Sequence, residues 1–280
     1  MATPGSDFRL DLNGNTLAGK DSVTVDLTRN VGDLAPTQET GGATASRRRL
    51  GGLRDPEISA DGLWIADASA LNGFPTVTVD PSLSDPPTLS NISEVTLTIT
   101  RTLVEEANSS NSGYIARSAS VVDVTASFAV DVDAASFNSS GSATSEIISA
   151  WKSTSGEVPI DIALPGGNTS FQADFIVETI PATAESESVT ESTIEVSSTG
   201  PITDTIYTSV GSGLDAILSE VFAQDPTPLT AKFTTGTTSD YTVEGPVLPS
   251  ELEITIPVES QEEGVSFSGT FPGAGAFTIS

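Results

Sequence analysis

The side chains of this chain that could do chemistry are almost all carboxylates. Its 280 residues include 38 Asp and Glu and 11 Lys and Arg, but no His and no Cys. The sequence therefore excludes a thiol nucleophile, a Ser-His-Asp triad, a His-ligated zinc and an imidazole general base. Sites built from carboxylates alone, such as a glycosidase pair or a calcium cage, remain chemically possible.

No particular carboxylates stand out as such a site. Asp131 with Asp133, and Asp80 with Asp85, are the closest pairs worth testing as calcium ligands. Neither pair belongs to the twelve-residue acidic loop with a glycine and a closing glutamate that holds calcium. We therefore predict no catalytic, metal or cofactor site and no enzyme activity, and we expect Trp64 and Trp151 to be core aromatics.

The formal net charge of −27 constrains the partners of the chain. So acidic a protein does not wrap the outside of DNA, because phosphate binding depends on Lys and Arg. The eight Arg exceed the three Lys, and scarce lysine with excess carboxylate is typical of proteins solvated in brine, where salt screens self-repulsion. We predict a halophilic source; an ordinary acidic extracellular or viral surface protein is the alternative.

The sequence offers no membrane element. No segment approaches the roughly 20 consecutive apolar residues of a membrane-spanning helix. The first ten residues lack the basic and apolar regions of a secretory signal. We expect no contact with a membrane.

The hydrophobic pattern predicts a mainly β fold. Apolar residues alternate with polar ones in several runs, which is the signature of half-buried antiparallel strands. Clusters of Gly, Pro and Asp separate these runs, as expected for turns. The runs include residues 22–28, 95–100, 128–133, 193–196 and 252–256.

Two segments follow a helical period instead. Leu214, Ile217, Leu218, Val221 and Phe222 form one apolar helical face, and Asp225-Pro226 supplies a stop. A shorter helix is predicted around Ile147, Ile148 and Trp151, spaced in the same way.

The order of these elements predicts an internal duplication. Residues 23–29 read VTVDLTR and residues 95–101 read VTLTITR, and a later tract begins near Arg49 in one half and near Arg117 in the other. Because the halves run front, front, back, back, we predict one β module inserted into another. The outer module comprises residues 1–75 and 200–280, and the inner module, tube-like or a decoration, comprises residues 76–199. The Pro- and Asp-rich segment from Asp80 to Pro87 is predicted to be a boundary linker.

Two segments of the outer module resemble the major tail tube proteins of long-tailed, siphovirus-like phages. They are Leu50–Trp64, LGGLRDPEISADGLW, and Val265–Gly275, VSFSGTFPGAG, the latter similar to the closing strand of that family. The resemblance covers about half of the chain. It implies a β-sandwich or barrel with one flanking helix, in subunits that join their sheets into rings around a lumen. The rings stack into the conduit that delivers DNA.

The resemblance, with the acidic composition, implies a structural virion protein from a virus of a halophilic archaeon. Its partners would be other copies and other tail proteins, and DNA would pass through the lumen without specific binding. If both modules take the tube fold, three chains make a pseudo-hexameric ring; if the inner module is a decoration, six are needed. We favour three. The protein would be in the virion tail, after assembly in the host cytoplasm, and the tail could be contractile or not.

The family resemblance also points to a contact loop. Residues 30–46 form a polar stretch of 17 residues with little to build a core, and Arg47, Arg48 and Arg49 follow it. In the family the equivalent loop reaches the neighbouring ring. Asp33, Glu39 and the three arginines are therefore predicted inter-ring contacts, since arginine bonds carboxylates in pairs. The alternative is a solvated basic turn.

A second class of function competes with the tail tube. Tandem β-sandwiches also serve as adhesin-type proteins on the cell surface, where one from a halophile would bind a protein or a glycan. The lack of a signal peptide counts against this alternative.

Overall fold

The computed structural model describes most of the chain. The described residues are 8–17, 20–34, 48–64, 75–106, 114–132, 141–163, 169–180, 190–200, 204–207, 212–223, 226–235, 241–257 and 265–280. Within them strands dominate and two helices occur, α2 (Ala143–Lys152) and α3 (Ser212–Phe222). The predicted mainly β fold with flanking helices is confirmed.

The strands form two sheets. The small sheet has the order β16-β13-β12-β1-β2, and it contains β1 (Phe8–Leu12), β2 (Asn15–Thr16), β12 (Leu229–Thr235), β13 (Tyr241–Val247) and β16 (Thr278–Ile279). The large sheet contains β3 (Lys20–Leu34), β4 (Arg48–Trp64), β5 (Thr76–Val79), β6 (Ile92–Glu106), β7 (Ala116–Val132), β8 (Glu157–Ala163), β9 (Thr169–Thr179), β10 (Thr190–Ser198), β11 (Asp204–Tyr207), β14 (Glu251–Pro257) and β15 (Val265–Pro272).

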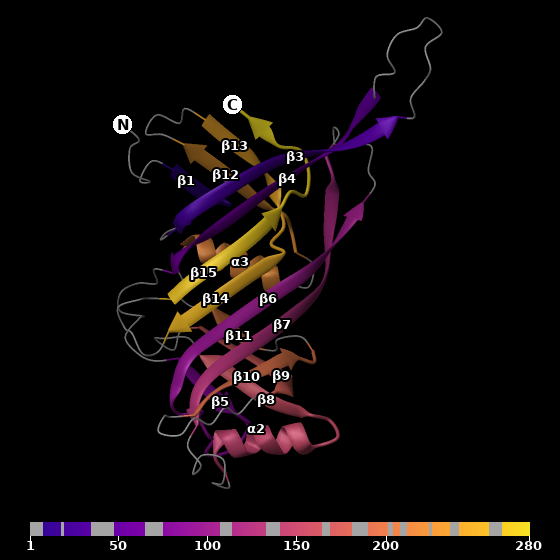
Figure 1. Cartoon of the computed structure of the whole chain (residues 1–280). Helices are drawn as coiled ribbons and strands as arrows, with labels where there is room; N and C mark the ends of the chain where they lie inside the picture. The colour runs from indigo at the N-terminus through magenta and orange to yellow at the C-terminus, as the bar shows by residue number, and fades with distance from the viewer. Residues whose placement is uncertain are drawn as a thin grey trace, which may run out of the picture.

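The large sheet runs along the whole length of an elongated molecule (Figure 1). Its order is β3-β4-β15-β14-β6-β7-β10-β9-β8-β5, and β11 pairs with β9 beside this path. Strands from both predicted modules therefore share one sheet, and the ladder between β14 and β6 joins them. β11, which the sequence assigned to the outer module, pairs with β9 of the inner one.

Two long hairpins in this sheet have the same construction. β3 and β6 are each 15 residues long, and β4 and β7 are each 17. The β3–β4 register shifts between Lys20 and Ser22 and between Arg29 and Val31. The β6–β7 register shifts at the corresponding places, between Ile92 and Glu94 and between Arg101 and Leu103. The VTVDLTR and VTLTITR motifs lie at the same position of each hairpin.

The core lies between the inner face of the large sheet, the small sheet and the two helices. Alternation along the strands decides which side chains enter it, because successive residues of a strand point to opposite faces. In β14, for example, Leu252 and Ile254 are buried while Glu251 and Glu253 are exposed. The largest fully buried side chains include Phe128, Phe171, Phe175 and Phe271.

The two helices pack against different strands of the molecule. α3 buries Ile217, Leu218 and Val221 and contacts β1, β2 and β12. α2 contacts β5, β8 and β9, and its N-terminus is capped by the Ser142 side chain, which accepts a hydrogen bond from the Ser145 N–H at 3.1 Å. Figure 1 shows α2 at the end of the molecule away from β3 and β4.

Three sequence predictions need correction. β3 continues to Leu34 and β4 begins at Arg48, so residues 30–34 belong to a strand and not to a loop. A polar sequence can form these strands because hydrogen bonds between β3 and β4 pair their backbone N–H and C=O groups. The segment from Asp80 to Pro87 is a hydrogen-bonded turn between β5 and β6, closed by the Val79 N–H to the Pro87 carbonyl, and not a linker.

The third correction concerns Trp151, which is 54% exposed instead of a core residue. The buried face of α2 consists of Ala143, Thr144, Ile147 and Ala150, and Trp151 points away from it. Nothing is described for the side chain of Trp64.

Candidate assembly surface

Three of the predicted contact residues, Asp33, Arg48 and Arg49, lie at the outer end of the β3–β4 hairpin. Asp33 pairs with Arg49 and Leu34 pairs with Arg48 in the antiparallel register. Glu39 and Arg47 lie outside the described residues. The hairpin therefore brings two of the predicted contact residues, Asp33 and Arg49, to directly opposite positions.

β3 forms one edge of the large sheet. Its neighbour on one side is β4, and no strand of the described residues pairs with its other side. The apolar side chains of its VTVDLTR motif are incompletely covered: Val23 and Val25 are half-buried, and Leu27 is 45% exposed. An edge strand of this length with apolar side chains is a template for pairing with another chain.

The equivalent strand β6 shows what such an edge looks like when it is covered. Its Val95, Leu97 and Ile99 occupy the positions of Val23, Val25 and Leu27, and all three are 0% exposed. β14 pairs with β6 along seven positions, from Glu251 opposite Thr100 to Pro257 opposite Glu94. The same motif is thus buried inside the chain in one hairpin and left at an edge in the other.

Arg101 follows the part of β6 that β14 covers, and it contacts α3. Its Nε and Nη2 donate to the Val221 carbonyl at 3.1 and 2.5 Å, and Nη2 also donates to the Ala223 carbonyl at 2.5 Å. The residue is 5% exposed. Burial lowers the pKa of the guanidinium, and the nearby Glu220 carboxylate opposes that effect. A cation at a helix C-terminus satisfies carbonyls that have no partner in the helix.

The outer part of the β6–β7 hairpin packs across β4. Ile115 N–H donates to the Arg54 carbonyl at 3.0 Å, and Arg54 Nη1 donates to the Tyr114 hydroxyl at 3.0 Å. The Arg54 guanidinium also lies 5.0 Å from the centre of the Tyr114 ring, and the Tyr114 hydroxyl donates to the Phe277 carbonyl at 3.0 Å. The β6–β7 hairpin is thereby fastened to β4 and to the C-terminal segment.

Arg117 makes the ionic part of the same contact. Its Nη2 lies 2.7 Å from Asp55 Oδ1 on β4 and 3.1 Å from Glu105 Oε1 on β6. Its Nη1 donates to the Gly273 carbonyl at 2.8 Å, and its side chain is only 8% exposed. A mostly buried arginine with three acceptors is far better held than an exposed ion pair.

A pocket lies beside the edge strand. It is lined by Leu27, Thr28, Arg29, Arg54, Pro56, Tyr114 and Ile279, and its volume is about 230 Å³. Exposed apolar side chains in a recess next to a free edge mark a surface suited to contact with protein.

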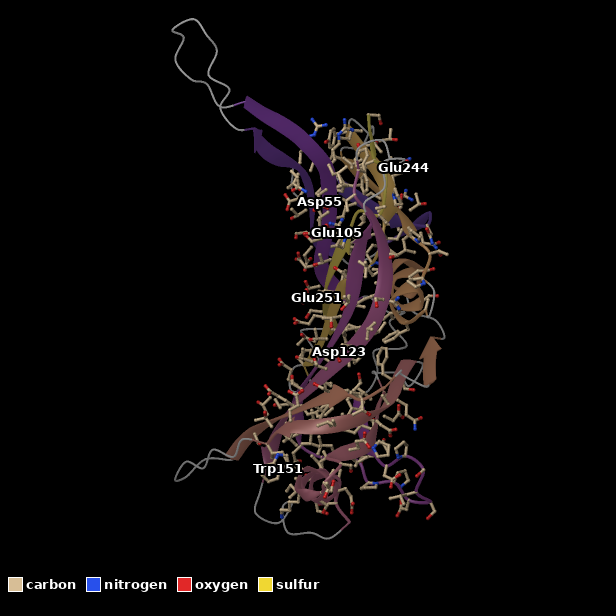
Figure 2. All side chains as sticks on the ribbon, turned by 90° about the vertical axis from the view of Figure 1, so that its right-hand side faces the viewer. Asp55, Glu105, Asp123, Trp151, Glu244 and Glu251 are labelled. Atoms are coloured by element: carbon tan, nitrogen blue, oxygen red, sulfur yellow. The ribbon has the colours of Figure 1, made fainter. Side chains whose placement is uncertain are left out.

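The outward face of the large sheet is rich in hydroxyls and carboxylates. Figure 2 shows Asp55, Glu105, Glu251 and Asp123 along one side of the sheet. Leu63, 41% exposed, and Ile176, 40% exposed, are apolar exceptions. The polar positions on this face include Ser22, Thr24, Asp26, Glu57, Ser59, Asp61, Thr96, Thr98, Thr125, Glu253, Ser266 and Ser268.

Two of these carboxylates face each other. Asp26 stands directly opposite Glu57 in the β3–β4 register. Like charges in this relation destabilise a strand pair by up to about 1 kcal/mol, so the acidity of this face has a cost in stability.

No group of three or more acidic side chains in the described ranges is arranged to hold a metal ion. Within the same ranges, no helix is long and apolar enough to cross a membrane.

Sequence reasoning missed several residues of this surface. No motif marks Asp123 or Tyr114. Asp55 lies within Leu50–Trp64 and Arg101 ends the VTLTITR repeat, but neither pattern assigns a contact to them; Arg117 is predicted only as the counterpart of Arg49. To match every residue of one hairpin with its counterpart in the other, the register shifts must be known, and these cannot be read from the sequence.

Comparison with known proteins adds little to this description. No model of a known protein family matches the chain. No curated protein matches it either. Two solved structures are similar: the tail of an empty gene transfer agent particle, refined helically with C6 symmetry, and the virion of a native gene transfer agent particle. In each case the identity is 13%, the match covers 74% of this chain and 100% of the other, and the TM-score is 0.19. At that TM-score the likeness establishes neither fold nor function.

Proposed function

We propose that this chain is a structural virion protein whose copies join side by side into rings, and that stacked rings form the tube of a viral tail. The observation that carries the proposal is the contrast between the two equivalent hairpins. β6 is covered along its edge by β14, whereas β3 presents the same apolar motif at the open edge of the sheet. A second copy could cover the edge of β3, because within the chain the equivalent strand β6 is already covered by β14.

The proposal treats the molecule as two related modules, with the outer one formed by residues 1–75 and 200–280 and the inner one by residues 76–199. The equal strand lengths and equal register shifts of the hairpins support it. The helices fit as well, since α2 precedes β8, which pairs with β5, and α3 precedes β12, which pairs with β1. In each case the strand after the helix pairs with the strand before the hairpin.

Ring closure by three copies is the form of assembly that we favour. The ladder between β14 and β6 is one module–module joint inside the chain. A joint between β3 of one copy and the β9 end of the next would be its repeat, so three chains would supply six modules. Closed rings of identical joints are the usual outcome of such heterologous contacts. Six copies per ring would instead follow if the inner module were a decoration.

The acidic face of the large sheet is proposed to line the lumen. Its carboxylates repel the phosphates of DNA, and its hydroxyls offer no cation to hold them. DNA would therefore pass without specific binding, and no catalytic role is proposed. The acidic composition supports a virus of a halophilic archaeon as the source.

The outer end of the β3–β4 hairpin projects from the body of the molecule (Figure 1). We propose that Glu39, Arg47 and Arg48 near this end contact the next ring. Other tail proteins would meet the first and last rings. Replacing Arg47 and Arg48 by Ser should leave rings intact and block their stacking, whereas tubes of normal length would contradict this role.

Negative-stain microscopy of the purified protein in molar salt, with native mass measurement, tests the function. We expect rings or tubes with a central hole and a closed particle of three times 28.7 kDa, about 86 kDa. A particle of twice that mass would favour six copies. A monomer at every salt and protein concentration would overturn the proposal and favour the adhesin-type alternative.

A further inference from the structure

The junction inside the chain contains one ion pair whose partners both recur elsewhere in the sequence. Arg117 on β7 bonds Asp55 on β4 at 2.7 Å, and this pair joins the β6–β7 hairpin to the β3–β4 hairpin. Because the two hairpins are equivalent, the position of Arg117 has a counterpart on β4, and the position of Asp55 has a counterpart on β7.

The registers identify these counterparts. Arg101 opposite Val122 corresponds to Arg29 opposite Arg54, so Asp123, next to Val122, takes the place of Asp55. Beyond the register shift, Glu105 stands opposite Arg117.

Asp33 stands opposite Arg49 in the same way. Arg49 thus takes the place of Arg117, and Asp33 takes that of Glu105. All three charged positions of the junction carry the same sign of charge in both hairpins.

Asp123 is available for such a contact. It lies on the acidic face of the large sheet, and its side chain is exposed (Figure 2). Asp55, its counterpart, is partly covered because Arg117 lies against it. Asp123 is thus the counterpart of Asp55, but no arginine of the described residues bonds it as Arg117 bonds Asp55.

We propose that Arg49 of one copy bonds Asp123 of the neighbouring copy, as Arg117 bonds Asp55 within the chain. Asp33 supports Arg49 from the adjacent strand, in the role of Glu105. This inference rests on the proposed side-by-side assembly and names the residues that set its register. It also assigns Arg49 to a contact within the ring, where the sequence had predicted a contact between rings.

Charge reversal tests the pairing. Arg49→Asp and Asp123→Arg each place like charges at the joint, so each single variant should raise the protein concentration needed for half-assembly by about tenfold or more. The double variant restores opposite charges and should return that concentration to within about threefold of the natural protein. Native mass and microscopy at 0.5 M salt report assembly, and circular dichroism reports the fold.

Matched controls reverse charges away from the joint. One control is Lys232→Asp, at a half-exposed position of β12. The other is Asp85→Arg, at an exposed position of the turn after β5. Both should assemble at the same concentration as the natural protein. If the controls lose assembly to the same extent as the single variants, the effect belongs to net charge and the proposed pair is overturned.

A cross-link provides an independent readout, since the chain has no cysteine. Arg49→Cys combined with Asp123→Cys should be joined between copies by a short bis-maleimide, which spans the length of an arginine side chain as a direct disulfide does not, whereas Arg49→Cys with Asp85→Cys should not be joined. Denaturing gels would show dimers and trimers with the cross-linker and monomers without it.

The outcomes separate the two proposals. If the natural protein never assembles, the proposed function fails. The Arg49–Asp123 pair is wrong if the natural protein assembles and any of three results is found: the single reversals assemble equally well, the double variant does not recover, or no cross-link forms. The proposed ring would remain supported in each of these cases.

Discussion

Arg101 shows how one side chain can hold two parts of the chain in register. It extends from β6 and caps the last turn of α3, 120 residues along the sequence, through two backbone carbonyls. Nη1 has no hydrogen-bond partner among the described residues, so part of the guanidinium is desolvated without compensation. Burial of the guanidinium has a desolvation cost, but its bonds to α3 fix the position of the helix relative to the sheet.

Replacing Arg101 should therefore destabilise the folded chain. Arg101→Gln leaves the Val221 and Ala223 carbonyls with at most one donor in a buried place, and we expect a loss of about 2 kcal/mol in the free energy of unfolding. Denaturant titration in molar salt would measure it. Arg29→Gln is the control, because Arg29 takes the place of Arg101 in the other hairpin but is exposed, so its loss should change stability by less than about 0.5 kcal/mol. Equal stability of the two variants would contradict the capping role.

A second prediction at this scale concerns the facing carboxylates Asp26 and Glu57. Asp26→Asn removes the repulsion while keeping the size of the side chain, so it should stabilise the subunit by a few tenths of a kcal/mol at low salt. The gain should shrink in molar salt, where charges are screened within about 3 Å. Thermal unfolding at two salt concentrations measures both effects. A stability loss at low salt would mean that Asp26 has a structural partner.

At the scale of elements, the end of α2 is the clearest feature that the described part of the chain leaves exposed. In α3, Phe222 follows the buried Val221 and packs on Phe171 of β9, with 5.7 Å between ring centres. In α2, Trp151 follows the buried Ala150 in the same way but is 54% exposed. In the proposed ring, the repeat would place Trp151 of one copy against the next copy, as Phe222 packs on Phe171 within the chain.

Trp151→Ala should weaken assembly without weakening the subunit. Burial of a tryptophan at an interface contributes about 2 kcal/mol, so the concentration for half-assembly should rise by roughly thirtyfold. The melting temperature of the monomer should stay unchanged, because the side chain contributes nothing to the core. Leu83→Ala is the matched control, since Leu83 is 48% exposed on the turn after β5. Assembly at the natural concentration would remove Trp151 from the joint.

The sequence predicted the elements better than their ends and their partners. Period-two runs located the strands, and a 3.6-residue period located the apolar face of α3, because burial on one side of an element imposes the period of that element. The outer parts of β3 and β4 were missed, since cross-strand bonds hold them without an apolar face. Trp151 was misplaced because an aromatic side chain at helical spacing was taken as buried. Pairs such as Arg117 with Asp55 depend on register shifts and on hairpins meeting across the sheet, which no local pattern encodes.

At the scale of the whole molecule, charge and shape act together. An elongated sheet with one acidic face and a net charge of −27 repels itself along its length. Neighbouring copies repel each other for the same reason, so contacts such as the one proposed for Arg49 must be few, local and well placed. Salt determines how far the repulsion reaches, because the screening length falls from about 10 Å at 0.1 M to about 3 Å at 1 M.

Assembly should therefore increase with salt, although its proposed ion pair is itself weakened by screening. Long-range repulsion among many carboxylates is lost first, while a pair in contact and partly buried is screened much less. We expect ring formation to rise between 0.1 and 1 M potassium chloride, as measured by native mass at fixed protein concentration. A variant with Asp26→Asn, Asp61→Asn, Glu251→Gln and Glu253→Gln should assemble at lower salt, because these residues supply the repulsion of the acidic face. If that variant needed as much salt as the natural protein, the salt effect would lie in apolar burial at the joint and not in the charge of the sheet.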